Sequence, residues 1–204
     1  MDKRFLQDHR SQQQRMLAGD HYLASDPQLI RDMDRAADLV AQFNAVPAQE
    51  HAARFAILER LFARIGDDSF IRPPFRCDYG SQISIGARTH VNWGLVAIDV
   101  ARISIGDDVL IGPNVQLLTA THPIEPEPRR QKWESSKPIT IADNVWLGGG
   151  VIVCPGVTIG ANCVIGAGSV VVKDLPTNVV AVGNPARIIR SLQASEDRSG
   201  LETT

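Results

Sequence analysis

The sequence predicts an all-β-dominated fold, a parallel β-helix built from hexapeptide repeats with a small N-terminal α-helical extension. Two observations carry this prediction. Aliphatic side chains recur at every sixth position between residues 105 and 171, apart from one break, and glycine often follows them. Aromatic residues make up only 5% of the 204 residues, which is typical of a core in which small side chains stack at regular intervals. A chain of this length suits one domain with an extension.

Residues 1–66 are expected to form a helical segment, although the first 25 residues are polar and give little. Ser25, Asp26 and Pro27 combine capping side chains with a proline at the first helical position. Apolar residues then recur at spacings of three and four, and a second stretch of this kind follows Pro47 and stops at Gly66. The predicted apolar faces are Leu29, Ile30, Met33, Ala37, Val40 and Phe43, then Phe55, Leu58, Leu61, Phe62 and Ile65. Two short helices cannot bury both faces alone, so they are expected to pack on the repeat region that comes after them in the chain.

Residues 67–190 are predicted to form the β-helix. Nine aliphatic residues stand in register, at Ile105, Ile111, Leu117, Ile141, Leu147, Val153, Ile159, Ile165 and Val171. The residues two positions earlier are small or β-branched almost throughout: Ile103, Val109, Val115, Ile139, Val145, Val151, Val157, Cys163 and Ser169. In such a repeat three units close a triangular coil, and successive coils stack about 4.8 Å apart. The glycines after the aliphatic residues are expected to turn the corners in a strained conformation.

The repeat is interrupted by a loop at residues 119–138, which contains Pro123, Pro126 and Pro128 and must leave the coil. Long loops in compact domains are usually functional or disordered. Residues 191–204 are polar and are expected to be a flexible tail.

Composition argues against several functional classes. Lys and Arg total 21 against 23 for Asp and Glu, which disfavours nucleic acid as the main partner. The longest apolar runs, such as residues 179–183, are too short to span a membrane, and the first residues have no apolar secretory segment. Cys77, Cys154 and Cys163 show no metal-ligand spacing. We therefore expect free thiols, no bound metal and a cytoplasmic location.

Among the five histidines, His122 stands where the repeat ends and the loop begins. Position alone leaves its role open, because a lone histidine is ordinarily structural. His51 is interpreted as part of the polar face of the second helix, and His9 and His21 belong to the polar N-terminus.

The chain resembles the hexapeptide-repeat O-acetyltransferases, the group of maltose, galactoside and nodulation-factor enzymes, and most of all the maltose branch. The specific motifs are Thr-His-Pro at 121–123 and Gly-Asn-Pro-Ala-Arg at 183–187. Further matching segments are 18–22, 75–80, 91–93, 98–100, 139–148 and 162–168, so that the resemblance covers roughly residues 15–192. It implies a left-handed coil, against the usual right-handed rule for parallel strands.

The resemblance implies that His122 is the general base of an acetyl transfer from acetyl-CoA to a sugar hydroxyl. A hydroxyl attacks a thioester poorly until its proton is removed, and imidazole suits that task near neutral pH. Asn92 matches a residue near the oxyanion and the acceptor hydroxyl. Asp78 and Asp99 match positions that line the acceptor pocket. The galactoside enzyme has Asp, Ser and Asp where this chain has Ala24, Asp78 and Val100, which leaves the identity of the sugar open.

For acetyl-CoA, the family pattern maps onto Trp146, Gly149, Ala167, Val172, Lys173, Arg187 and Arg190. Backbone groups at Gly149 and Ala167 are expected to meet the pantetheine amides, and the basic side chains to meet the phosphates. A solvated basic surface is the alternative for these cationic residues.

A homotrimer with active sites between subunits is also expected. The positions that must point outward from the coil are Ser104, Leu110, Gln116, Thr140, Trp146, Ile152, Thr158, Val164 and Val170. Five of these nine are apolar, so this stripe needs a cover. Closed symmetry packs identical faces together, and the resemblance implies a threefold arrangement. The alternative cover is the helical hairpin or the loop of the same chain.

Three other functions stay open. A zinc carbonic anhydrase built on a β-helix needs three histidine ligands, whereas the repeat region has only His90 and His122. A non-catalytic scaffold would leave His122 without a role. An acetyltransferase for a non-sugar acceptor, such as an antibiotic or serine, would share the donor site.

Overall fold

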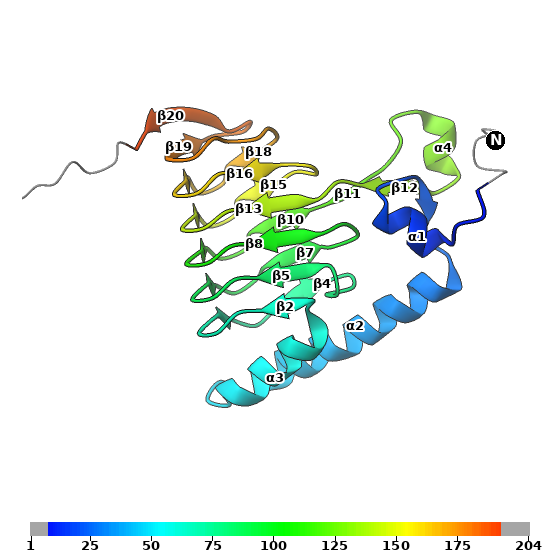
Figure 1. The fold of residues 1–204 in the computed structure, drawn as a ribbon, viewed down its shortest axis with the longest axis horizontal. Helices are drawn as coiled ribbons and strands as arrows, with labels where there is room; N and C mark the ends of the chain where they lie inside the picture. Colours follow the sequence, from blue (N-terminus) through cyan, green and yellow to red (C-terminus); the bar gives the residue numbers. More distant parts are fainter. Residues whose placement is uncertain (1–7, 193–204) are drawn as a thin grey trace, which may run out of the picture.

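The repeat region folds into a column of stacked triangular coils, as the computed structural model of residues 8–192 shows (Figure 1). The prediction is confirmed: the fold is a left-handed parallel β-helix of about six turns. Each coil crosses three faces of the column, and the strands of each face pair in parallel with those of the coils above and below, except that the last strand of the second face pairs antiparallel.

The strands of the three faces follow one another along the chain. The first face contains β2 (Arg64–Ile65), β5 (Ile83–Ile85), β8 (Ile103–Ile105), β13 (Ile139–Ile141) and β16 (Thr158–Ile159). The second face contains β3 (Phe70–Ile71), β6 (His90–Val91), β9 (Leu110–Ile111), β14 (Trp146–Leu147), β17 (Val164–Ile165), β19 (Val179–Val182) and β20 (Arg187–Ser191). The third face contains β4 (Arg76–Cys77), β7 (Val96–Ile98), β10 (Gln116–Leu118), β15 (Ile152–Val153) and β18 (Val170–Val171). We call the bends from first to second, second to third and third to first face the first, second and third corners.

The core of the column is the predicted one. All nine repeat aliphatics are buried, with exposed fractions of 5% or less. The small residues two positions earlier are buried as well, including Cys163. The outward positions between them are at least partly accessible, and Leu110 and Trp146 are 49% and 53% exposed. Inward and outward residues therefore alternate, as the period of two in a strand requires.

The structural reason why glycine follows many of the buried aliphatic residues differs from the predicted one. The glycines directly after the aliphatics do not have positive φ angles; the left-handed residues stand two positions later, as at Asn114 (φ 57°) and Gly150 (φ 69°). What excludes a side chain is the next coil. A Cβ on Gly112 would lie 2.6 Å from the backbone N of Gly149, and a Cβ on Gly148 would lie 2.6 Å from that of Ala167. These glycines therefore permit close stacking rather than strained turns.

Helices cover the N-terminal end of the column (Figure 1). They are α2 (Pro27–Ala45) and α3 (His51–Leu61), whereas α1 (Gln12–Leu17) lies away from this end, beside β12 (Trp133–Ser136) in Figure 1. Phe43 of α2 packs edge-on against Phe75, with 6.4 Å between ring centroids, and Phe62 does so at 5.5 Å. The Asn44 side chain donates to the Phe75 carbonyl at 3.0 Å and accepts from the Phe75 N–H at 2.9 Å. The helical hairpin thus closes the end of the core, as predicted.

Three details of the helical prediction are wrong. The buried face of α2 consists of Leu29, Ala36, Leu39, Val40 and Phe43, whereas Ile30, Met33 and Ala37 are exposed. Helix α3 ends at Leu61, and Ile65 belongs to β2, where it pairs with Ile85. Gly66 is consequently a corner of the first coil and not a helix stop. Helix α1 has no counterpart in the prediction, although Ser11 and Gln14 form a capping box at its start.

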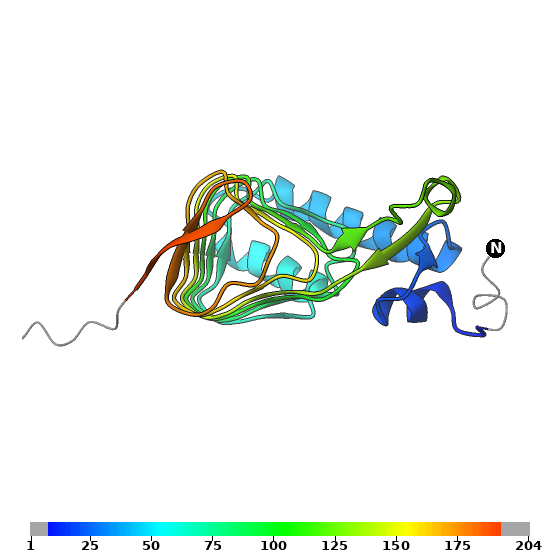
Figure 2. The same ribbon diagram turned by 90° about the horizontal axis from the view of Figure 1, so that it is seen from above.

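Residues 119–138 project from the third corner (Figures 1 and 2). This excursion contains β11 (Ala120–Thr121), α4 (Pro126–Arg130) and β12 (Trp133–Ser136). Strand β12 pairs antiparallel with β11 on one side and with β1 (Tyr22–Leu23) on the other.

At the C-terminal end of the described chain, Ser191 still belongs to β20, and the rest of the predicted tail from residue 193 onward lies outside the described residues. No helix between residues 8 and 192 is long and apolar enough to cross a membrane.

Candidate active site

His122 lies at the start of the excursion and is exposed. The buried Thr119 fixes the point where the chain leaves the coil, because its hydroxyl donates to the Ile98 carbonyl at 2.6 Å and accepts from the Ala101 N–H at 3.0 Å. The Nδ1 atom of His122 lies 3.3 Å from the carbonyl oxygen of Trp133. A carbonyl oxygen only accepts, so this bond places the proton on Nδ1 and leaves Nε2 as the basic atom of the neutral ring.

Three acidic or phenolic side chains, those of Tyr22, Glu134 and Asp78, belong to the excursion or to segments close to it. The Tyr22 hydroxyl donates to Glu134 of β12 at 2.7 Å. Burial, and then the negative charge of Glu134, raise the pKa of Asp78. Asp78 is half-buried and follows β4 at the third corner. Asp78 therefore lies at the same corner of the column as the excursion.

Asp99 does not have the predicted access to a ligand. Its side chain is fully buried, and its oxygens accept from the backbone N–H groups of Asp78 at 3.0 Å, Tyr79 at 2.9 Å and Gln82 at 3.3 Å. Burial raises the pKa of Asp99 to about 7, against the effect of these hydrogen bonds. Asp99 thus shapes the loop that carries Asp78 rather than facing an acceptor.

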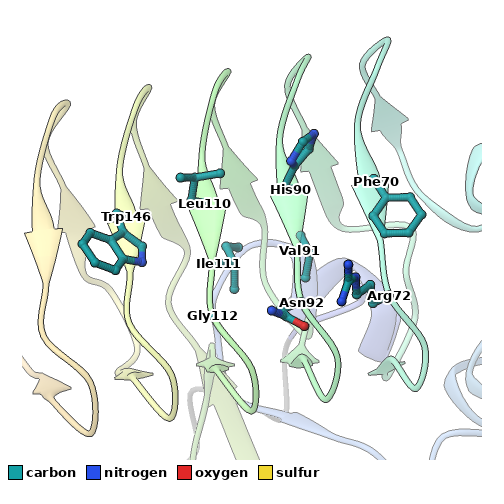
Figure 3. A pocket seen from close by; sticks show the side chains of 9 residues that line it. All are labelled: Phe70, Arg72, His90, Val91, Asn92, Leu110, Ile111, Gly112 and Trp146. Carbon is teal, nitrogen blue, oxygen red and sulfur yellow. The ribbon is translucent and has the colours of Figure 1, made fainter.

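Asn92 lines a pocket of about 300 Å³ on the second face (Figure 3). Its Oδ1 accepts from the Trp93 N–H at 2.9 Å, which orients the amide and leaves Nδ2 as the donor. The guanidinium of Arg72 lies 5.1 Å from the Trp93 ring centre and so stacks on it. Leu110 and Trp146 line the same pocket.

The residues predicted to bind acetyl-CoA are distributed over two corners and the C-terminal hairpin. Gly149 and Ala167 lie at the second corner, where the Gly149 carbonyl accepts from the Gly168 N–H at 2.9 Å. Val172 and Lys173 follow β18 at the third corner and are exposed. Arg187 and Arg190 are exposed on β20, which pairs antiparallel with β19. All of these are accessible except Gly149, which is partly buried.

A single chain does not bring His122 and Asn92 together. His122 belongs to the third corner and Asn92 to the second, and the third-face strands separate the two. A strand of three residues such as β7 is roughly 10 Å long, before the corners are added. Viewed along the coil, the green excursion and the red β20 of the second face lie on opposite sides of the triangle (Figure 2).

Two further expectations concern cysteines and metals. Cys77, Cys154 and Cys163 are free thiols. Within residues 8–192, no group of three or more His, Cys, Asp or Glu side chains is placed to hold a metal ion.

The residues near His122 that reasoning from the sequence missed are Tyr22, Glu134 and the Trp133 carbonyl. The Tyr22–Glu134 contact joins positions 112 residues apart, and no local pattern signals such a pairing.

Two family models match the chain. The maltose acetyltransferase hexapeptide capping motif matches residues 15–66, and the bacterial transferase hexapeptide model, with six repeats, matches residues 138–173. Galactoside O-acetyltransferase of Lactococcus lactis is 40% identical over 86% of this chain and 85% of its own length.

Solved structures agree with these matches. A maltose O-acetyltransferase from Clostridium difficile superposes with a TM-score of 0.90 at 43% identity, over 92% of this chain and 100% of that one. A hexapeptide-repeat acetyltransferase from Vibrio cholerae, complexed with acetyl coenzyme A, superposes with a TM-score of 0.84 at 39% identity, over 91% and 100% of the two chains. The chain therefore belongs to the hexapeptide-repeat acetyltransferase family that includes the maltose and galactoside O-acetyltransferases.

Proposed function

We propose that this protein transfers an acetyl group from acetyl-CoA to a hydroxyl group of a sugar of the maltose, glucose or galactoside kind, in the cytoplasm. The observation that carries the proposal is the geometry of His122, an exposed imidazole whose Nδ1 is bonded to a backbone carbonyl. The named activities of the relatives and the acetyl coenzyme A in the Vibrio cholerae structure support the choice of donor and acceptor.

The reaction proceeds directly in a ternary complex. Nε2 of His122 takes the proton of the acceptor hydroxyl while the hydroxyl oxygen attacks the thioester carbonyl carbon. The tetrahedral intermediate then collapses, the carbon–sulfur bond breaks, and the imidazolium returns its proton to the departing CoA thiolate. Asn92 donates its Nδ2–H to the oxyanion, a role that suits an amide whose oxygen is already bonded to Trp93. Asp78 accepts a hydrogen bond from the acceptor.

The active sites lie between the subunits of a homotrimer. This part of the proposal is supported by the separation of His122 and Asn92 on different corners of one chain. It is also supported by the second face, where exposed Leu110 and Trp146 line an open pocket that lacks a cover within residues 8–192. A neighbouring copy that presents its third corner to this face covers the apolar pocket and completes the site.

Acetyl-CoA binds in the cleft between neighbouring columns. Gly149 and Ala167 offer backbone groups to the pantetheine amides, and Trp146 and Val172 offer apolar contact. Lys173, Arg187 and Arg190 neutralise the phosphates, and each of the three is exposed.

A panel of acceptors tests the proposal. The purified protein is incubated with acetyl-CoA and maltose, glucose, a galactoside, serine or an aminoglycoside, and the release of free CoA thiol is followed. We expect release that depends on a sugar and the acetylated sugar as product. Thiol release that depends only on serine or the aminoglycoside would contradict the sugar assignment, and failure of the protein to bind acetyl-CoA would contradict the enzyme assignment.

A further inference from the structure

The N-terminal segment and the excursion form one small sheet. Strand β12 lies in the middle, with β1 pairing through Tyr22↔Glu134 and Leu23↔Trp133. On its other side β11 pairs through Ala120↔Ser136 and Thr121↔Ser135. Continuing this second register by one residue sets His122 opposite Glu134. Segments 100 residues apart in the sequence thus meet beside His122, and Figure 1 shows α1 and β1 against β12.

The contacts of β1 make it a firm edge for this sheet. Tyr22 is fully buried in an apolar cluster with Met16, Leu29, Tyr79 and Val100. Its hydroxyl donates to Glu134 at 2.7 Å, and the Leu23 N–H donates to the Gln12 side chain at 2.8 Å. The cluster combines side chains of α1, β1, α2 and the coil. Strand β1 is therefore anchored to the column independently of the excursion.

Strand β12 depends on this anchor. Without β1, the excursion would be a two-stranded hairpin with two paired residues on each strand, and isolated hairpins are marginally stable in water. The carbonyl of Trp133 that accepts from Nδ1 of His122 belongs to this strand. The next residue, Glu134, is the one that Tyr22 holds. A displacement of β12 thus moves the group that selects the tautomer of His122.

We propose that residues 12–23 are a clamp that positions His122, with Tyr22 as the positioning residue acting through Glu134 and the Trp133 carbonyl. Tyr22 does not touch the reacting atoms. It holds β12 so that Nδ1 of His122 stays protonated and Nε2 stays available as the base. The catalytic consequence rests on the proposed function; the effect on the tautomer does not.

The tautomer is measured by ¹⁵N NMR on full-length protein labelled at its histidines, with the His122 signal identified as the one that a His122→Gln variant lacks. In the unaltered protein we expect the Nδ1–H form to dominate. In Tyr22→Phe, which removes only the hydroxyl, we expect a mixture of both tautomers at His122. Glu134→Gln retains a side-chain oxygen that accepts from the Tyr22 hydroxyl, and this variant should preserve the Nδ1–H form of His122.

Kinetics give the second readout. We expect Tyr22→Phe and Glu134→Ala each to lower kcat about tenfold, with the KM for acetyl-CoA unchanged, because one hydrogen bond is lost. The double variant should be no worse than either single variant, since both remove the same contact. Glu134→Gln should restore most of the loss.

Asn44→Ala is the control for general destabilisation. It removes the two bonds to the Phe75 backbone at the end of the column, away from β12, and should lower the melting temperature without changing the tautomer of His122. A Tyr22→Phe variant with the parental tautomer and the parental kcat would overturn the clamp. So would an Asn44→Ala variant that mixes the tautomers to the same extent. If no sugar is acetylated, the proposed function fails while the NMR result still decides the clamp.

Discussion

At His122, the bond to a backbone carbonyl decides which nitrogen can act. Because the Trp133 oxygen accepts from Nδ1, the lone pair of the neutral ring lies on Nε2 and points away from β12. In the proposed role as base, an exposed side chain in this state accepts the proton of a substrate hydroxyl without any rearrangement of its own hydrogen bonds.

Removal of this imidazole tests its role as the base. We expect His122→Ala to lower the rate of sugar acetylation by about 10²–10⁴-fold, the usual effect of losing a general base, while acetyl-CoA still binds. The side chain is exposed, so the melting temperature should stay near that of the parent protein. A variant with near-normal kcat on its best acceptor would contradict this role.

Asp99 predicts a pH dependence of stability. Burial raises the pKa of the Asp99 carboxyl to about 7, whereas the pKa of an aspartate in the unfolded chain is about 4. The folded state therefore binds a proton more tightly than the unfolded state. The stability from this difference is complete below about pH 4 and is lost as the pH rises through about 7.

Urea unfolding at several pH values measures this contribution. The free energy of unfolding should fall for the parent protein between these pH values, and Asp99→Asn, which does not titrate, should lack that component. The same slope in both proteins would show that Asp99 is not the group responsible.

Among the elements, the strands of the coil were predictable and the strands of the excursion were not. Each coil strand buries an aliphatic such as Ile165 at a fixed spacing, so the sequence repeats the same signal many times. Strand β12 follows the short helix α4 and has a partner, Tyr22, more than 100 residues away. This pairing joins segments that are distant in the sequence, so it leaves no repeating pattern from which it could be predicted.

The same contrast explains the errors in the site. His122 stands out in the sequence as a candidate because it lies at the break in the repeat and within a family motif, and its catalytic role stays a prediction. The burial of Asp99 was not predictable, since the backbone N–H groups that it binds belong to a loop about 20 residues earlier in the chain. In α2, both possible apolar stripes include Leu29 and Phe43, and only packing on the column selects Ala36 and Leu39 over Ile30 and Met33.

Stacking of the coils is tested by two neighbouring glycines. A Cβ on Gly148 would meet the Ala167 backbone at 2.6 Å, whereas a Cβ on Gly149 would come no closer than 3.4 Å to its nearest neighbour, Pro113. Gly148→Ala should therefore lower the melting temperature strongly or prevent folding, because two coils must separate. Gly149→Ala should have a small effect. Equal melting temperatures for the two variants would contradict the stacking argument.

For the whole molecule, the proposed site divides between two corners of the column, with His122 at the third corner and Asn92 at the second. In the proposed homotrimer, the exposed apolar pocket on the second face of one subunit meets the excursion that projects from the third corner of the next. In this arrangement each active site takes Asn92 from one subunit and His122 from the next.

Complementation between inactive subunits tests whether the active site is shared between neighbouring chains. His122→Ala and Asn92→Ala chains are co-expressed, and light scattering first confirms a mass near about three times the 22.2 kDa of one chain. In random mixed trimers, about one interface in four joins an intact His122 to an intact Asn92. We expect the mixture to recover roughly a quarter of the parental activity, well above either variant alone. A mixture no more active than the average of the two separate variants, or a mass of one chain, would contradict it.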